Sequence, residues 1–468
     1  MRKMKFYISI VCLFLSSVAF SQQDLTIHLM PMVPQSIYTN PSFIPTPKVY
    51  VGFPGLSSMY FGVTHNGFAY KDLIRKRKDD SLYIDVDNAL SKMTQKNFFS
   101  ANVQIDLFSF GFKLKKKNYF SFSVAEKVAF KLGYPKDLMS LLWKGNGQFI
   151  GKTANFDGIG VNFTHYREYG LGYARVINDK LTVGIRPKYL LGMTNVNTTK
   201  SNISLYTNEA DYALTAKSDI LINSSIDSNI YAENGDFNNP DISTIVPMYK
   251  YLTNTENKGF GIDLGATYKL SERISFSASV IDWGSITWKS NIRNFSNKNG
   301  EFTFDGIDLN EFLSNTDTAN SGLEKMLDSL QTIFELKESN ESYKSPIGTK
   351  IYLTGAFNLT PKDKVGALVR FEIFNKMWHP SLTISYNKQI GNMLSLTANY
   401  SILNRSYSNV GFGMALNLGF WQIYATADNI WGAFYPTTAR NAIIHFGMNF
   451  VFGYRKMKNN ENVPQMRF

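Results

Sequence analysis

Large apolar residues alternate with small or polar residues along most of this chain. Residues 102–127 show the pattern most clearly, and their apolar positions are Phe108, Phe110, Phe112, Leu114, Phe120, Phe122 and Val124. Successive side chains of a β-strand point to opposite faces, so a period of two predicts strands rather than helices. This stretch therefore predicts a hairpin with one apolar face and one polar face.

The same alternation recurs along the rest of the sequence. It predicts fourteen strands, near residues 48–64, 101–114, 119–131, 161–177, 181–196, 258–270, 273–287, 348–359, 364–375, 379–388, 393–404, 408–418, 420–430 and 441–453. A soluble antiparallel sheet also alternates, but its apolar face needs a cover of helices or a second sheet. The sequence offers no such cover, and a sheet in hydrocarbon must close on itself. We therefore predict an all-β fold, a transmembrane antiparallel β-barrel of about 14 strands.

The lengths of the connections support this interpretation. Six tight connections follow every second predicted strand, at residues 115–118, 178–180, 271–272, 360–363, 389–392 and 419. The four long connections, at 65–100, 132–160, 197–257 and 288–347, all have the opposite parity. Short periplasmic turns and long outer loops are typical of outer-membrane barrels.

Composition and the N-terminus agree with export to a membrane. The chain has a net charge of +12, 15% aromatic residues and a mean hydropathy of −0.18. The basic residues Arg2, Lys3 and Lys5 precede a short apolar stretch, which predicts a signal peptide over residues 1–21 and an outer-membrane location. Cys12 is the single cysteine, so we expect no disulfide and no thiolate site after cleavage.

Three further segments follow from this layout. Residues 22–47 are rich in proline and moderately apolar, so we expect them to form a hatch or plug inside the barrel of residues 48–453. Residues 454–468 are basic and predict a periplasmic tail.

The predicted polar faces carry charges of both signs, which favours a filled lumen over an open pore. These candidate lumen charges are Arg186, Lys188, Asp263, Lys269, Arg370 and Glu372.

One residue conflicts with the pattern. The register of residues 120–124 places Glu126 on the lipid face, where a charge at mid-depth costs about 2 kcal/mol. A bulge, a position at the membrane interface or a covering partner would each resolve the conflict.

The loops contain other candidate features. Residues 75–80 form a charge run that suits either a solvated loop tip or contact with lipopolysaccharide phosphates. Residues 135–145 and 321–338 have helical spacing. The stripe of the second segment consists of Leu323, Met326, Leu327, Leu330 and Phe334, and it would pack on the loops or bind a partner protein. The segments around Tyr206 and Tyr212 also alternate, but they lie within the long connection 197–257. They therefore predict a loop hairpin rather than wall strands.

No motif points to catalysis, a cofactor or nucleic acid. The five histidines, including His445, lack metal-ligand spacing, and no serine lies in a nucleophile elbow. We therefore expect His445 to be a hydrogen-bonding residue of the lumen. We predict no enzyme, no cofactor, no metal site and no nucleic-acid partner.

Several motifs resemble known families. The stretches "TNPSFIP", "VGFPGLSSMYFGVTHNGFAYKDLI", "GFGIDLGATYKLSERISFSASVIDWGSITWK" and "YATADNI" resemble an uncharacterised family of outer-membrane barrels from Bacteroidota. More distantly, the chain is similar to fatty-acid transporter barrels of the FadL/TodX type and to barrels associated with type IX secretion. The transporter resemblance implies a hatch with an Asn-Pro motif, here Asn40 and Pro41, followed by Phe43.

The last predicted strand, "HFGMNFVF", resembles the signal that the barrel assembly machinery recognises. Its candidate residues are Gly447, Phe450 and Phe452.

Two functions remain open from the sequence. The first is binding or transport of small hydrophobic molecules, which predicts an apolar pocket at the hatch and a bulge or gap in one strand. The second is a structural or accessory barrel that binds partner proteins, which predicts a filled lumen and a docking surface outside it.

Overall fold

The computed structural model describes residues 24–115, 117–226, 250–304, 336–374, 377–403, 405–435 and 437–453. The predicted signal peptide (1–21), the C-terminal tail (454–468) and nearly all of the segment 321–338 lie outside these ranges. None of the helices in the described part is long and apolar enough to cross a membrane.

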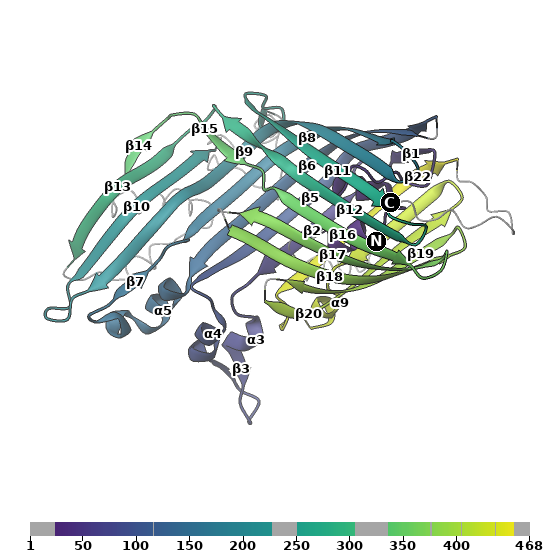
Figure 1. The fold of residues 1–468 in the computed structure, drawn as a ribbon. Coiled ribbons are helices and arrows are strands. Elements are labelled where there is room, and N and C mark those ends of the chain that lie inside the picture. Colours follow the sequence, from purple (N-terminus) through teal and green to yellow (C-terminus); the bar gives the residue numbers. More distant parts are fainter. Residues whose placement is uncertain are drawn as a thin grey trace, which may run out of the picture.

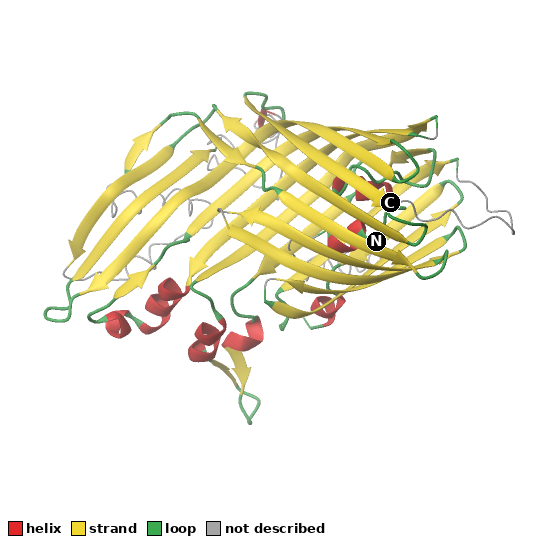
Figure 2. Cartoon of the chain, in the orientation of Figure 1, coloured by secondary structure: helices red, strands yellow, loops and turns green. Residues whose placement is uncertain are grey.

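The described chain forms a closed antiparallel barrel of fourteen strands (Figures 1 and 2). The first wall strand has two parts, β1 (Val49–Gly52) and β2 (Met59–His65), and both pair with β5 on one side and with β22 on the other. The other wall strands are β5 (Lys96–Leu114), β6 (Asn118–Pro135), β8 (Gly160–Val176), β9 (Leu181–Thr207), β11 (Asn257–Lys269), β12 (Ile274–Trp288), β16 (Lys350–Asn358), β17 (Asp363–Phe374), β18 (Met377–Ile390), β19 (Leu394–Leu403), β20 (Ser406–Leu418), β21 (Trp421–Ala427) and β22 (Asn441–Phe452). The predicted fold class is confirmed.

The two faces of the wall differ as the alternation predicted. Along β18 the outward residues Leu382, Ile384 and Tyr386 are about half exposed. The inward residues that alternate with them are polar and buried, namely Ser381, Thr383 and Ser385. Aromatic pairs such as Phe112 and Phe120, with ring centroids 5.5 Å apart, cover neighbouring strands on the outside. The outer face of the barrel is therefore apolar and the inner face polar.

The two rims of the barrel also differ. Tight turns join the strands at one rim, and the long connections lie at the other rim, as the parity of the loops predicted. The elements of these connections are α3 (Tyr70–Leu73), β3 (Ile74–Lys76), β4 (Leu82–Ile84), α4 (Val86–Lys92), α5 (Lys136–Lys144), η2 (Asn146–Phe149), β7 (Thr153–Asn155) and α9 (Ile430–Phe434). Helix α5 begins after Pro135 and ends at Gly145, which agrees with the predicted helix.

A sheet extends past the barrel beyond the long-loop rim. Strand β9 does not end at residue 196 but continues to Thr207, where it pairs with β10 (Leu214–Ser225). Strands β13 (Asn294–Phe304) and β14 (Lys337–Ser339) complete this extension, which lies at the left in Figure 1. A further strand, β15 (Tyr343–Pro346), pairs with the end of β12. Tyr206 and Tyr212 belong to the β9–β10 hairpin, outside the barrel wall.

Two other predicted strand boundaries were wrong for local reasons. The first strand is interrupted at residues 53–58, where Pro54 and Gly55 form a turn within the wall. Strand β21 ends at Ala427 instead of residue 430, because Asn429 caps α9 through a hydrogen bond from the Gly432 amide.

Glu126 points outward from β6, as its register predicted, but it has partners. Arg167 lies directly opposite on β8 and donates from Nε at 2.5 Å, and His165 Nε2 lies 3.2 Å from the carboxylate. The next outward residue on β8 is Tyr169, whose ring lies beside that of Tyr189 on the neighbouring strand. Glu126 is therefore an ion-paired residue next to a pair of outward aromatic rings, and β6 needs no bulge at this point.

Candidate functional site

The N-terminal segment, residues 24–47, lies inside the barrel. It contains a short helix, α2 (Leu25–His28), and a 3-10 helix, η1 (Pro34–Tyr38), and most of its side chains are fully buried. Leu25 and Leu29 pack against Tyr352 of β16 and Leu368 of β17, whereas Met30 packs against Tyr424 of β21. The segment thus fills the space between distant strands.

Glycines of the wall make room for this segment. A Cβ atom on Gly184 would lie 2.1 Å from the carbonyl oxygen of Pro41, and one on Gly265 would lie 2.1 Å from Asn40 Oδ1. Neither position could carry a side chain without movement of the backbone or of Asn40. Asn40 accepts hydrogen bonds from the Ser42 amide and hydroxyl at 2.9 and 2.7 Å, which fixes the turn against the two glycines.

Hydrogen bonds hold the N-terminal segment against the barrel wall at several points. Asp428 accepts from the amides of Leu25 and Thr26 at 3.1 and 2.9 Å. Gln35 and Asn449 exchange two hydrogen bonds of 2.7 and 2.9 Å through their amide groups. Such satisfied buried contacts hold the chain in one arrangement, because an unpaired buried polar group costs about 1–3 kcal/mol.

His28 and Phe43 anchor the middle of the segment. Burial lowers the pKa of His28 to about 3, so the neutral ring bonds to Thr39 at 3.0 Å through Nδ1 and to Thr354 at 2.7 Å through Nε2. The ring stacks on Tyr352 with centroids 4.9 Å apart. Phe43 is fully buried and packs against Ala356.

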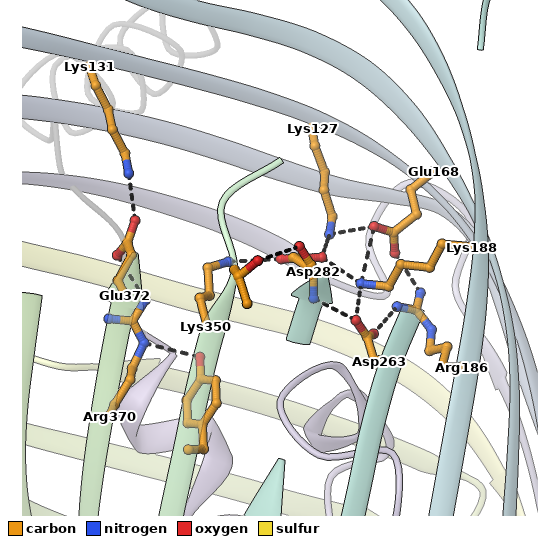
Figure 3. Close-up of polar contacts among 12 residues, drawn as sticks. Lys127, Lys131, Glu168, Arg186, Lys188, Asp263, Asp282, Lys350, Arg370 and Glu372 are labelled. Carbon is orange, nitrogen blue, oxygen red and sulfur yellow. Dashed lines mark hydrogen bonds and ion pairs between the residues drawn. The ribbon is translucent and has the colours of Figure 1, made fainter. Parts of the chain in front are cut away.

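A network of buried ion pairs lies beside the N-terminal segment (Figure 3). Arg186 contacts Glu168 at 2.8 Å and Asp263 at 3.1 Å. Lys188 contacts Asp263 at 2.6 Å and Asp282 at 2.5 Å. These charges come from strands β8, β9, β11 and β12, and all are at most 4% exposed in their side chains. Paired in this way, the charges avoid the large cost of an isolated buried ion.

A second group of buried ion pairs crosses the lumen. Lys131 of β6, the third wall strand, contacts Glu372 of β17, the ninth wall strand, at 2.6 Å. Glu372 in turn pairs with Arg370 at 3.0 Å. A second crossing joins Phe98 of β5 to His379 of β18, with ring centroids 5.0 Å apart. Opposite walls therefore meet at this level of the barrel.

The structure brings together most of the predicted lumen charges. Arg186, Lys188 and Asp263 lie in the first group of ion pairs, and Arg370 and Glu372 lie in the second. Lys269 lies at the end of β11, about 20 Å along the strand from Asp263. Other members were missed by the sequence reasoning, namely Lys127, Lys131, Glu168, Asp282 and Lys350.

Two of the missed residues illustrate what the alternation can and cannot reveal. Lys127 follows the same register as the buried residues Ser121 and Ser123, so the pattern could have found it. Asp282 could not be found in this way, because the register of β12 places it outside. A bulge with φ +58° at Asp282 turns its carboxylate inward to Lys188 and Lys350.

The wall is interrupted beside the N-terminal segment. Between β1 and β2, residues 53–58 lie opposite only two residues of β22, because Gly52 pairs with Asn449 and Met59 pairs with Phe446. Leu56 at the turn is 38% exposed, whereas Ser57 and Ser58 are fully buried. Strand β5 has a bulge at the same height, at Asp106–Phe108. The segment 53–58 stays hydrogen-bonded to Met448 of β22, so the interruption is a large bulge, one of the two alternatives (a bulge or a gap) expected for the transport hypothesis.

The candidate assembly residues have separate positions on β22. Phe450 contacts Trp421 on the outside with centroids 4.8 Å apart, and Phe452 is 48% exposed near the short-turn rim. Gly447 faces the lumen, where a Cβ atom would lie 2.1 Å from the Ser57 carbonyl oxygen. Gly447 therefore has a packing role at the wall interruption.

Within the described ranges, no group of three or more His, Cys, Asp or Glu side chains could hold a metal ion. The contacts described above instead pair each carboxylate of the network with lysine or arginine.

A family profile matches residues 41–428 and carries the description "Family of unknown function (DUF5723)". This chain belongs to that family. No curated protein matches the sequence.

Solved barrels of several kinds share a distant likeness to the DUF5723 chain. The toluene transporter TbuX of Ralstonia pickettii is 10% identical, with a TM-score of 0.37 over 90% of this chain and 94% of that one. A FadL homologue of Pseudomonas aeruginosa is 9% identical, with a TM-score of 0.39 over 94% and 99%. The translocator domain of the autotransporter NalP from Neisseria meningitidis is 7% identical, with a TM-score of 0.33 over 92% and 95%.

Replacement of Gly184 by valine tests the fit between the wall and the N-terminal segment. The new side chain would collide with Pro41, so we expect a loss of about 1–3 kcal/mol in stability and faster cleavage of residues 24–47 by chymotrypsin. Gly355→Ala is the matched control, because its nearest contact would be an ordinary 3.5 Å from Phe276. Equal cleavage of the two variants would contradict the proposed fit.

Proposed function

We propose that this protein is an outer-membrane barrel that admits small apolar molecules through a gated lumen and a lateral opening in its wall. In this proposal residues 1–21 direct export, and Gly447, Phe450 and Phe452 are recognised by the barrel assembly machinery. The apolar outer face contacts lipid, and the long loops contact lipopolysaccharide. The observation that carries the proposal is the interruption of the wall at residues 53–58, next to the buried N-terminal segment.

The buried ion pair that crosses the lumen supports gating. A buried ion pair is a weak source of stability compared with apolar packing, and its best-attested role is to specify one arrangement or to switch between two. Lys131 and Glu372 join opposite walls through such a pair. Their separation would open the lumen without breaking any strand pairing, since both residues project from intact ladders.

The N-terminal segment supplies a second closure beside the ion pairs. It is held by side-chain contacts and does not pair as a strand of the wall. Its displacement would therefore leave the barrel ladder intact. Asn40 and Pro41, which rest on two wall glycines, are among the residues that fix its position.

In this proposal the wall interruption is the route between the lumen and the bilayer. The turn at residues 54–56 is exposed on the outside at Leu56, and Ser57 and Ser58 border the lumen. Phe53 packs on Phe450 with ring centroids 5.9 Å apart, so the outer edge of the turn is apolar. A small apolar molecule leaving the lumen here would pass directly into hydrocarbon, where its transfer is favourable.

A partner-binding accessory barrel is the second candidate, and the sheet extension favours it. Strands β9, β10, β13 and β14 project beyond the long-loop rim and add a surface that a simple transporter does not need. Native mass spectrometry of the protein extracted gently from its own membrane separates the candidates. A retained small apolar adduct supports transport, whereas a retained protein subunit without such an adduct supports the accessory function.

The crossing ion pair gives the first test of gating. Glu372→Gln leaves Lys131 and Arg370 without their carboxylate, which costs about 3–5 kcal/mol in the closed state. We expect several-fold faster uptake of the apolar dye N-phenylnaphthylamine by cells that carry this variant. Asp80→Asn, which breaks the exposed pair with Lys76, is the control. Uptake equal to the control would argue against this gate.

A reversible crosslink tests the N-terminal closure. The Cβ position of Gly265 lies 3.1 Å from Asn40 Cγ, so cysteines at residues 40 and 265 are close enough for a disulfide. We expect dye uptake to stop on oxidation and to recover on reduction. A pair at Val369 and Leu382, which face each other on neighbouring strands, is the control for oxidation itself. Full uptake by the verified crosslinked protein would exclude movement of this segment from the transport step.

A further inference from the structure

Three residues far apart in the sequence form a hydrogen-bonded chain at the wall interruption. Ser58 Oγ lies 2.7 Å from His445 Nε2, and His445 Nδ1 lies 3.2 Å from Asp24 Oδ1. Ser58 comes from the interrupted first strand, His445 from β22 and Asp24 from the start of the N-terminal segment. The order of the contacts, hydroxyl to imidazole to carboxylate, is that of a serine hydrolase triad.

The carboxylate determines which ring nitrogen carries the proton. Desolvation by burial raises the pKa of Asp24, but the hydrogen bond and charge of His445, together with Lys350 and Arg370, outweigh it and leave the pKa below its usual value. An ionised Asp24 only accepts, so His445 Nδ1 donates to it and Nε2 is left as the acceptor. The Ser58 hydroxyl then donates to Nε2, which is the arrangement needed to activate it.

A neighbouring tyrosine does not disturb this arrangement. The Tyr424 hydroxyl lies 3.3 Å from His445 Nε2, but it has only one proton and donates this to the Ser57 carbonyl at 2.9 Å. Tyr60 packs edge-on against the His445 ring, with centroids 5.6 Å apart. Among the described contacts, the buried Tyr60 hydroxyl has no hydrogen-bond partner.

We propose that Ser58, His445 and Asp24 hydrolyse apolar carboxylic esters. Ser58 Oγ bonds to the ester carbonyl carbon while its proton passes to His445 Nε2. The bond to the alcohol then breaks, and the leaving oxygen takes that proton. Water attacks the acyl-serine, again giving a proton to His445, and the release of the acid returns this proton to Ser58. No oxidant, metal or other cofactor is needed.

The position of Ser58 defines the route and the class of substrate. Ser58 is fully buried in the closed structure, but it belongs to the turn-containing segment 53–58, in which Leu56 is exposed on the outside. An outward movement of this segment would bring Ser58 to the edge of the hydrocarbon. Phe53 and Leu56 flank this edge, so the acyl chain of the ester is expected to be apolar. This activity does not depend on transport through the lumen.

Labelling by a biotinylated fluorophosphonate tests the triad. Purified, folded protein is incubated with the probe in detergent micelles, and peptide mass spectrometry then locates the label. We expect modification of Ser58 and hydrolysis of p-nitrophenyl butyrate, both lost in Ser58→Ala. Asp24→Asn should slow labelling by at least about a hundredfold, because it destabilises the required imidazole tautomer.

The adjacent serine supplies the matched control. Ser57→Ala removes an equally buried hydroxyl from the same turn, and it should retain both labelling and hydrolysis. Faster migration of unheated samples in gels would confirm that all variants are folded. Failure of the folded wild-type protein to react, or equal labelling of Ser58→Ala, would overturn the proposal and leave the three residues as a buried hydrogen-bond network.

Discussion

A barrel of fourteen strands encloses more space than its own inward side chains can fill, and the rest of this structure depends on how that space is occupied. The chain uses its N-terminal segment for one part and long charged side chains for another. Both solutions impose conditions on the wall. Gly184 and Gly265 must lack side chains where Asn40 and Pro41 rest, and each buried carboxylate of the network must meet a cation.

Tyr38 connects the N-terminal segment with the network of buried ion pairs. Its hydroxyl donates to Asp106 at 2.5 Å, and the Arg186 guanidinium lies 4.9 Å from the centre of its ring. Arg186 is itself a central member of the ion-pair network. A displacement of the N-terminal segment would therefore remove a contact from this network.

Both proposals meet at the interruption of the first wall strand. In a closed ladder each backbone group finds its partner across the strand, and six residues opposite two cannot follow that rule. The turn satisfies its backbone by other means, since Met448 bonds to both Phe53 and Leu56, and the Ser58 carbonyl accepts from the Asp106 amide. This local solution places Ser58 against His445.

The sequence by itself determined the barrel, its strand number and the character of its faces, because a period of two and the alternation of short and long loops are local properties. It also pointed to Arg186, Lys188, Asp263, Arg370 and Glu372, whose inward direction follows from the register of their strands. It missed Asp282, since a single bulge reverses the side on which a residue lies. Only the tertiary structure decided that Lys131 meets Glu372 across the lumen and that residues 24, 58 and 445 meet at one point. Closure of the barrel brings such distant residues together, and no local pattern records which of them will touch.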